Sequence, residues 1–231
     1  MSLVEALNRA IFNALNARDR EPRYRVFRNN SLDYTLCSAL PKLWRADKEM
    51  AYLQLEQLFG KGVCLVVNEI AKWNAELGRA LQSDTQVKDK LASCAGLRIV
   101  DTYTFISSSA GWTAFGAHVD FEHSIILDVA GKGRDIYVWQ AGKNVGQLKQ
   151  DARSFFGISF DYYKHLQTAH LTTLAPGQIH MIPKMEPHVF HANGPGMFIG
   201  LSCVEAKGKD GSGVLPYQDD ALIPFSQQLP T

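Results

Sequence analysis

The chain has 231 residues, a length that suits one large β-rich domain with a helical flank, and we expect no second independent domain. Lys and Arg number 24 against 23 Asp and Glu, so the formal net charge is only +1. This balance argues against nucleic acid or an anionic membrane as the main partner, because both require a basic surface.

The cysteines and the first residues indicate a cytoplasmic protein. Cys37, Cys64, Cys94 and Cys203 form no C-x-x-C pair, and the first three sit in apolar or mixed sequence that is typical of buried thiols. The N-terminal segment carries Glu5 and has no long apolar core, so it resembles neither a signal peptide nor a membrane span. We therefore expect a reduced cytoplasmic protein without a membrane partner.

The first half of the chain predicts helices. Residues 2–17 have the spacing of an amphipathic helix, and Ser2 and Glu5 fit a capping box at its start. Residues 47–59 predict a second helix, which should stop at Gly60. Both helices are expected to pack on the core.

Between the two helices, residues 17–30 contain five arginines. Tyr24, Val26 and Phe27 alternate with arginines, which predicts a charged edge strand with Tyr24 and Phe27 turned inward. A solvated or ligand-gripping loop is the alternative for this stretch.

A buried strand and a third helix follow the second helix. Residues 63–67 are apolar throughout and predict the strand. Asn68 is then expected to cap a helix. The residues of this helix that should face the core are Ile70, Trp73, Leu77 and Leu81.

From about Leu97 the pattern changes to short strands separated by turns, which predicts a β-sandwich or barrel. Residues 154–166 are rich in aromatics and predict a substrate-side loop or lid, with plain packing as the alternative. The tail after Lys207 should lie along the domain or along a neighbouring subunit. A homodimer is therefore a possible assembly. The clearest strands are 99–107, the one carrying His118 and Asp120, 135–140, 178–182 and 197–204.

His118, Asp120 and His188 are the candidate metal ligands. His118 and Asp120 are two residues apart, and residues i and i+2 of a strand point to the same side. His188 follows a β-like run that ends at Pro183 and a short loop. Two histidines and one carboxylate leave the other positions of a metal open, as in non-heme Fe(II) oxygenases. The alternative for the H-x-D pattern alone is a pair of polar residues at a strand edge.

The segments 111–139 and 174–193 resemble the JmjC-type, cupin-fold 2-oxoglutarate oxygenases. In that family an H-x-D motif is followed by a strand into G-x-K/R and then by P-G-D-x-L-Y-I-P-x-x-x-x-H. Here residues 176–183 read PGQIHMIP, and His188 follows. Gln178 replaces the usual acid and His180 the usual apolar residue. The match covers roughly residues 60 to 208.

The resemblance implies a mainly β fold with flanking helices, built on a double-stranded β-helix of the jelly-roll, cupin or JmjC-like kind. Residues 1–95 would form an N-terminal helical flank, 96–208 the catalytic core and 209–231 an extended tail, all in a single domain. It also implies that His118, Asp120 and His188 hold Fe(II) and are catalytic, with His191 as the nearest rival to His188.

The family binds the distal carboxylate of 2-oxoglutarate with a Lys or Arg at the start of the strand after the H-x-D strand. Counting without gaps places Gly133 there, so a turn one residue longer would bring in Arg134, and Lys132 is the second choice. The resemblance places Ser202 near the co-substrate, and hydroxyl contacts from Tyr103 and Thr104 are further candidates, although packing is the alternative for both.

The implied activity is an Fe(II)- and 2-oxoglutarate-dependent dioxygenase that uses O2, hydroxylates an unactivated C–H bond and yields succinate and CO2. We expect a small metabolite, amino acid or peptide as the substrate. Trp112, Phe115 and Phe121 could form an apolar rim around it, or simply pack. The alternatives are a ribosomal-type protein hydroxylase of the JmjC class, a cupin metal enzyme without 2-oxoglutarate, and a non-catalytic binding module.

Overall fold

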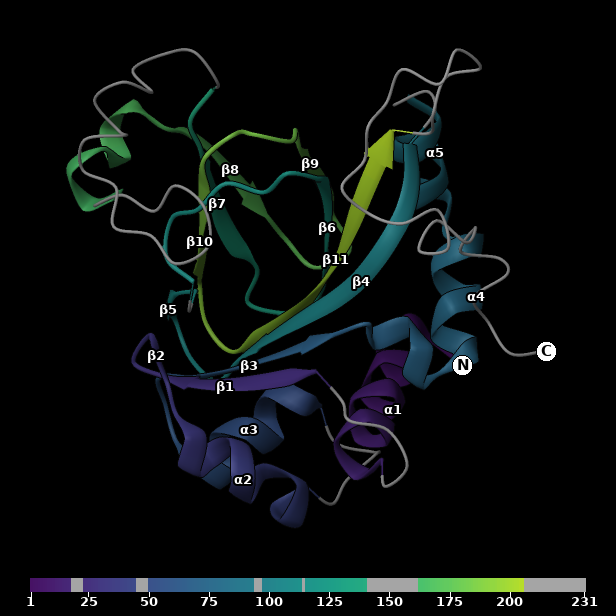
Figure 1. The fold of residues 1–231 in the computed structure, drawn as a ribbon, viewed down its shortest axis with the longest axis vertical. Helices are drawn as coiled ribbons and strands as arrows, with labels where there is room; N and C mark the ends of the chain where they lie inside the picture. The colour runs from purple at the N-terminus through teal and green to yellow at the C-terminus, as the bar shows by residue number, and fades with distance from the viewer. Residues whose placement is uncertain (18–22, 45–49, 94–96, 114, 141–161, 206–231) are drawn as a thin grey trace.

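Two antiparallel sheets face each other across the interior of the protein (Figure 1). The computed structural model describes residues 1–17, 23–44, 50–93, 97–113, 115–140 and 162–205. The larger sheet has seven strands in the order β2 (Ser31–Leu32), β1 (Tyr24–Arg28), β3 (Val63–Asn68), β4 (Leu97–Ser107), β11 (Gly196–Glu205), β6 (His123–Gly131) and β9 (Ile179–Ile182). The smaller has four, in the order β5 (Gly111–Trp112), β10 (His188–Ala192), β7 (Arg134–Val138) and β8 (His170–Leu174).

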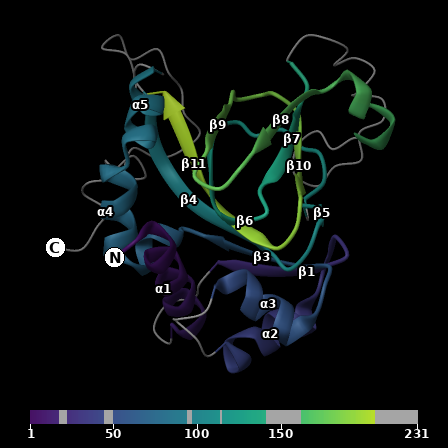
Figure 2. The same ribbon diagram turned by 180° about the vertical axis from the view of Figure 1, so that it is seen from behind.

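Helices cover the outer face of the larger sheet, whereas the smaller sheet covers its inner face (Figures 1 and 2). Alternate residues of β11 divide between these faces, because side chains point to opposite sides along a strand. Ile199 belongs to the core shared with the helices, and Phe198 belongs to the core between the two sheets. The helices are α1 (Leu3–Asn16), α2 (Tyr34–Leu43), α3 (Ala51–Phe59), α4 (Ala75–Ser83) and α5 (Thr85–Ser93), with 3-10 turns at Ile70–Trp73, Tyr162–Lys164 and Leu166–Thr168.

This arrangement confirms the predicted jelly-roll β fold with flanking helices. Two local predictions also hold. At the start of α1, the Glu5 N–H donates to Ser2 Oγ at 3.2 Å and the Ser2 N–H donates to Glu5 Oε2 at 2.7 Å, which completes the capping box. Gly60 ends α3 with a φ of 77°, a conformation that glycine adopts without steric cost.

The third helix begins later in the chain than the sequence predicted. Asn68 is the last residue of β3, and Glu69 then takes a left-handed conformation with φ of 55°. A 3-10 turn follows, and α4 begins only after Asn74, whose side chain accepts a hydrogen bond from the Glu76 N–H at 3.1 Å. The apolar spacing is nevertheless correct, because Ile70, Leu77 and Leu81 are fully buried.

The arginine-rich stretch supplies a strand, but this strand is not at the edge and its parity differs from the prediction. β1 lies between β2 and β3. Tyr24 and Phe27 are three residues apart, so they must face opposite sides. Phe27 packs in the core between the sheets, while Tyr24 packs toward the helices and donates to the Cys37 carbonyl at 2.8 Å. The N-terminal part of the chain therefore extends the larger sheet as well as covering it.

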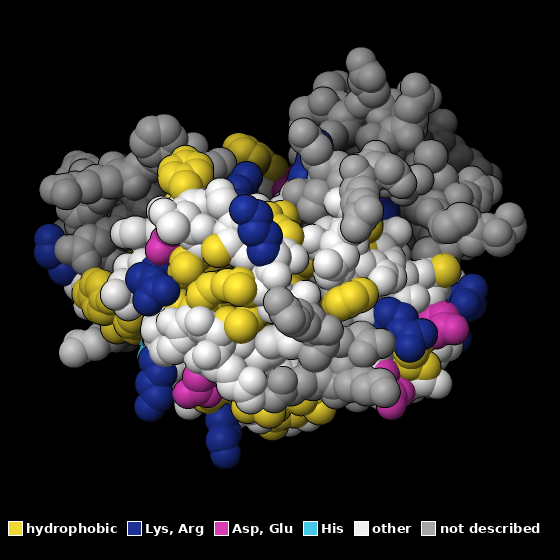
Figure 3. All heavy atoms as spheres, turned by 90° about the horizontal axis from the view of Figure 1, so that it is seen from below, with side chains coloured by type: hydrophobic (Ala, Val, Ile, Leu, Met, Phe, Trp, Pro, Cys, Tyr) yellow, Lys and Arg dark blue, Asp and Glu magenta, His cyan; other side chains and the backbone are white. Residues whose placement is uncertain are grey.

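The surface below the helices mixes apolar and charged side chains. Lys and Arg lie as separate spots on the described part of this face (Figure 3). In the described part of the chain, no helix is both long and apolar enough to span a membrane. The thiols of Cys64 and Cys203 are buried and that of Cys37 is half-buried. Cys94, most of residues 154–166 and the tail from 206 onward, including 209–231, lie outside the described residues.

Candidate metal centre

The three predicted ligands come together beside the inner face of the barrel. One side-chain donor atom from each of His118, Asp120 and His188 lies within 4.8 Å of the others. His118 Nε2 is 3.6 Å from Asp120 Oδ1, and His188 Nε2 is 3.5 Å from Asp120 Oδ2. Such a set of two imidazoles and one carboxylate could hold a divalent metal and leave positions on it for other ligands.

The structure brings His118 and Asp120 together without the strand that the sequence predicted for them. Both lie in the loop before β6. Their position depends on a pair of backbone hydrogen bonds between His118 and His188, at 3.0 and 2.9 Å, and on the Met185 N–H, which donates to the Asp120 carbonyl at 2.8 Å. The loop is therefore fastened to the segment that carries His188, the first residue of β10.

Each histidine is oriented by its second ring nitrogen. His118 Nδ1 is 3.0 Å from the Gly116 carbonyl, and His188 Nδ1 is 2.9 Å from the Glu186 carbonyl. A carbonyl only accepts, so Nδ1 must carry the proton in both rings and Nε2 presents its lone pair toward Asp120. Outer partners of this kind fix ring orientation in metal-binding histidines.

The environment favours the metal-binding protonation states of His118 and Asp120. Burial, together with the neighbouring His188, lowers the pKa of His118 to about 4. Burial alone would raise the pKa of Asp120, but the proximity of His188 and His118 lowers it overall. The Ser124 hydroxyl also donates to Asp120 Oδ2 at 3.3 Å. A neutral imidazole beside an ionised carboxylate is the form that binds a metal.

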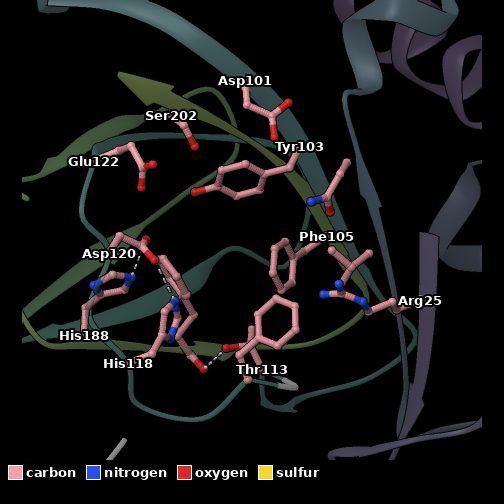
Figure 4. A pocket seen from close by; sticks show the side chains of 14 residues that line it. Arg25, Asp101, Tyr103, Phe105, Thr113, His118, Asp120, Glu122, His188 and Ser202 are labelled. Atoms are coloured by element: carbon pink, nitrogen blue, oxygen red, sulfur yellow. Dashed lines mark hydrogen bonds and ion pairs between the residues drawn. The ribbon is translucent and has the colours of Figure 1, made fainter. Parts of the chain in front are cut away.

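The triad opens onto a cavity of about 450 Å³ between the sheets (Figure 4). Of the predicted residues, Tyr103, Ser202 and Phe115 also line it. Burial raises the pKa of Tyr103, with a further contribution from Asp120, so its hydroxyl stays protonated and lies 3.4 Å from Ser124 Oγ. The residues that the sequence reasoning missed at this cavity are Arg25, Val66, Asn68, Asp101, Phe105, Thr113, Glu122 and Phe190.

Two proposed co-substrate contacts, Thr104 and Lys132, lie away from the cavity. Thr104 has the opposite parity to Tyr103 on β4, and its hydroxyl donates to the Phe198 carbonyl at 2.7 Å. Lys132 is in the turn between β6 and β7, with its side chain against Gly194. Neither is among the described residues that line the cavity.

Arg134 is turned into the barrel but does not line the cavity. Its side chain is 1 % exposed, its Nε pairs with Asp128 Oδ2 at 2.5 Å, and its guanidinium lies 4.0 Å from the centre of the Phe198 ring. Burial raises the pKa of Asp128 and lowers that of Arg134, while the pairing opposes both shifts. Arg134 Nη1 is buried with no hydrogen-bond partner among the described residues.

The alternative ligand His191 lies away from the triad. Its ring packs 4.9 Å from that of Trp112, and its Nδ1 is 3.3 Å from Asn193 Oδ1. Trp112 also contacts Tyr137 rather than the cavity, and Phe121 is 70 % exposed. Of the three aromatics predicted as a rim, Phe115 alone takes that position in the structure.

Comparison with known proteins finds likeness in structure but not in sequence. No family model matches the chain, and no curated protein matches its sequence. The X-ray structure of Escherichia coli YcfD superimposes with a TM-score of 0.51 at 16% identity, over 85% of this chain and 45% of that one. The fold is that of the JmjC-type, cupin-like oxygenases.

Two further structures match with lower TM-scores. YcfD, described as a ribosomal oxygenase from E. coli in complex with cobalt and succinic acid, gives a TM-score of 0.48 at 17% identity, over 86% of this chain and 43% of that one. A cupin superfamily protein from Desulfitobacterium hafniense gives 0.30 at 10% identity, over 47% and 69%. The chain spans less than half the length of these YcfD chains.

Proposed function

We propose that this protein is an Fe(II)- and 2-oxoglutarate-dependent oxygenase that hydroxylates an unactivated C–H bond. The observation that carries the proposal is the convergence of His118, Asp120 and His188 on one edge of a cavity large enough for a small organic ligand. The shared JmjC-like fold supports it. The overall reaction would convert substrate, 2-oxoglutarate and O2 into hydroxylated substrate, succinate and CO2.

The donor atoms fit Fe(II). Imidazole nitrogen and carboxylate oxygen suit this ion, and a three-residue set leaves the coordination that a 2-oxo acid and dioxygen need. When bound, the iron would activate dioxygen, which would oxidise both the 2-oxo acid, to succinate and CO2, and the C–H bond. The Gly116 and Glu186 carbonyls hold the two rings, and the Ser124 hydroxyl holds one carboxylate oxygen, so the ligand set would be rigid before the metal arrives.

Tyr103 and Ser202 are the predicted co-substrate residues that line the cavity, and both would offer hydroxyl groups to a bound acid. Arg134, the predicted anchor for the distal carboxylate, has a buried Nη1 that could donate to it. The carboxylate of Asp128 already neutralises part of the positive charge of Arg134. The aromatic side chains Phe105, Phe115 and Phe190 would keep water away from the reacting carbon.

The substrate class has two candidates. A small metabolite, amino acid or peptide suits a cavity of about 450 Å³. A ribosomal-type protein hydroxylase fits the fold at least as well, because YcfD shares it and is described as a ribosomal oxygenase. In the second case, only the target side chain would enter the cavity.

A cupin metal enzyme that does not use 2-oxoglutarate is the second candidate function. The specific observation in its favour is the ion pair of Arg134 with Asp128, which leaves the predicted anchor outside the cavity lining. Such an enzyme would bind the same metal through the same triad. It would form no succinate.

The test is succinate formation coupled to O2 uptake by the Fe(II)-loaded protein. We expect 2-oxoglutarate turnover above the rate of free Fe(II), even without substrate. His188→Ala should abolish both metal retention and turnover, because it removes one of three ligands. His191→Ala is the matched control, three residues along the same strand but away from the triad, and should retain both. Bound iron without any succinate would contradict the proposal and favour the second candidate.

A further inference from the structure

The cavity beside the metal centre is unevenly charged. Asp101, Asp120 and Glu122 line it with carboxyl groups. Among the described residues that line it, Arg25 is the one with a permanent positive charge. Figure 4 shows Arg25 across the cavity from Asp120 and Glu122. An anionic group in this space is repelled on one side and attracted to Arg25 on the other.

Strand parity directs Arg25 into the cavity. β1 pairs with β3 so that Arg25 lies opposite Val66, and Val66 also lines the cavity. Phe27, two residues along the same face of β1, packs edge-on against Phe115 with ring centres 5.4 Å apart. The side chain of Arg25 therefore belongs to the inner face of the barrel although its strand comes from the N-terminal part of the chain.

Aromatic rings separate Arg25 from the metal ligands. Phe105 and Phe115 meet at 5.4 Å in an edge arrangement, and both line the cavity. Figure 4 shows Phe105 between Arg25 and the triad. These rings form an apolar wall between the metal ligands and Arg25, while Arg25 itself stays exposed to solvent. Asn68, which also lines the cavity, adds an amide donor.

Arg134, the predicted anchor, is not part of the cavity wall. Arg134 is buried, paired with Asp128 and stacked on Phe198, and it does not line the cavity. Of these two arginines, Arg25 is therefore the one that a ligand in the cavity meets directly.

We propose that Arg25 binds the carboxylate of a ligand held in the metal cavity. The planar guanidinium can hold a carboxylate through two parallel hydrogen bonds. That carboxylate has two sources, the distal end of the 2-oxo acid or an acidic group of the substrate. The identity of the 2-oxo acid rests on the proposed function. The presence of a carboxylate-binding site at Arg25 does not.

Three variants test the site. Arg25→Gln removes the charge, and Arg25→Lys keeps the charge but loses the two-pronged geometry. Arg23→Gln is the matched control, because it makes the same charge change two residues away at an exposed position that does not line the cavity. Both positions are exposed to solvent, so the three variants should fold, and their melting temperatures should match that of the natural chain within a few degrees.

The first arm titrates the Co(II)-loaded protein with 2-oxoglutarate and with pyruvate, which has the same 2-oxo acid group but no distal carboxylate. If the co-substrate is the source, Arg25→Gln weakens 2-oxoglutarate binding by at least about tenfold and leaves pyruvate unchanged. Arg25→Lys should fall between Arg25→Gln and the natural chain.

The second arm uses 3-phenylpropionate and its neutral amide, added to the Co(II) protein in the presence of 2-oxoglutarate. If the substrate is the source, Arg25→Gln weakens binding of the acid by at least about tenfold and leaves the amide unchanged, while 2-oxoglutarate binds as before. Arg23→Gln should change none of the four affinities.

Equal affinities in Arg25→Gln and Arg23→Gln for all four probes would overturn the inference. So would a natural chain that prefers neither 2-oxoglutarate over pyruvate nor the acid over its amide. The two proposals fail separately. If no 2-oxo acid binds the metal-loaded protein, the proposed function is lost, while the acid and amide pair still decides the role of Arg25.

Discussion

Asp101 is a cavity carboxyl whose ionised form is disfavoured by the folded protein. Burial raises its pKa to about 6, and the nearby charge of Glu69 adds to the effect. Its Oδ1 accepts a hydrogen bond from the Thr102 N–H at 2.6 Å, which opposes the shift without cancelling it. Because the folded pKa lies above the unfolded value, ionisation costs stability above about pH 6 and costs nothing below about pH 4.

Asp101→Asn should therefore stabilise the protein at neutral pH. The amide keeps an oxygen for the Thr102 N–H and has no charge to bury. We expect a gain of about 1 to 2 kcal/mol in the free energy of unfolding at pH 7.5, falling toward zero near pH 4. Urea denaturation of both proteins across this pH range measures the difference. A gain that does not change with pH would show that the charge of Asp101 is not its cause.

At the residue scale, the sequence predicted the triad but not its surroundings. His118, Asp120 and His188 could be found because ligand type and order along the chain are visible in the sequence. Arg25 could not be singled out, because residues 17–30 contain five arginines. A shift of one residue in the strand register would turn a different arginine toward the inner face of the sheet. The alternation of Asp101, Tyr103 and Phe105 on β4 was a usable signal for one wall of the cavity.

The turn between β6 and β7 follows Gly131, a position at which the surrounding backbone leaves no space for a side chain. Gly131 has a φ of 112°, and a Cβ added there would overlap the backbone of Pro195 and Gly196. Gly177, in the turn before β9, also has a positive φ, 85°, but an added Cβ would meet nothing within 4 Å. Substitutions at these two glycines therefore distinguish the cost of backbone strain from the cost of steric overlap.

Gly177→Ala should cost about 1 to 2 kcal/mol of stability, the usual strain of a left-handed alanine. Gly131→Ala should cost clearly more, about 3 kcal/mol or above, because the sheet must also move. Chemical denaturation of both variants gives the comparison. Equal losses would mean that the close approach at Gly131 relaxes without cost.

At the element scale, predictions succeeded where a cap or a long apolar pattern marks the boundary. The capping box of Ser2 and the Gly60 stop are such marks. Helix α2 was missed because Pro41 lies inside it, and β8 because its exposed residues show no apolar alternation. The H-x-D segment forms a loop with a single β-bridge, since its geometry depends on residues about 70 positions later in the chain.

One core links the N-terminal helices to the barrel. Leu7 of α1 and Ile199 of β11 are both fully buried in the cluster that lies between the helices and the larger sheet. β1 and β3, from the first third of the chain, are hydrogen-bonded members of that sheet. Segments 1–95 and 96–208 therefore share one continuous core, and the boundary near residue 95 remains a prediction.

The described protein should unfold as one cooperative unit. Leu7→Ala should lower the free energy of unfolding by about 2 to 5 kcal/mol, because it leaves a cavity in this core. Far-ultraviolet circular dichroism and tryptophan fluorescence should still report the same midpoint in the variant. If the helical signal were lost first, at lower denaturant, the helices would form a separate unit.

The central claim is that His118, Asp120 and His188 hold one Fe(II) with positions open to a 2-oxo acid. Anaerobic titration of the Fe(II) protein with 2-oxoglutarate tests it most directly, through the weak visible metal-to-ligand charge-transfer band of the chelate. We predict a band that saturates at one 2-oxoglutarate per iron and is absent in Asp120→Ala. Stoichiometric iron without any band in the natural chain would contradict the account.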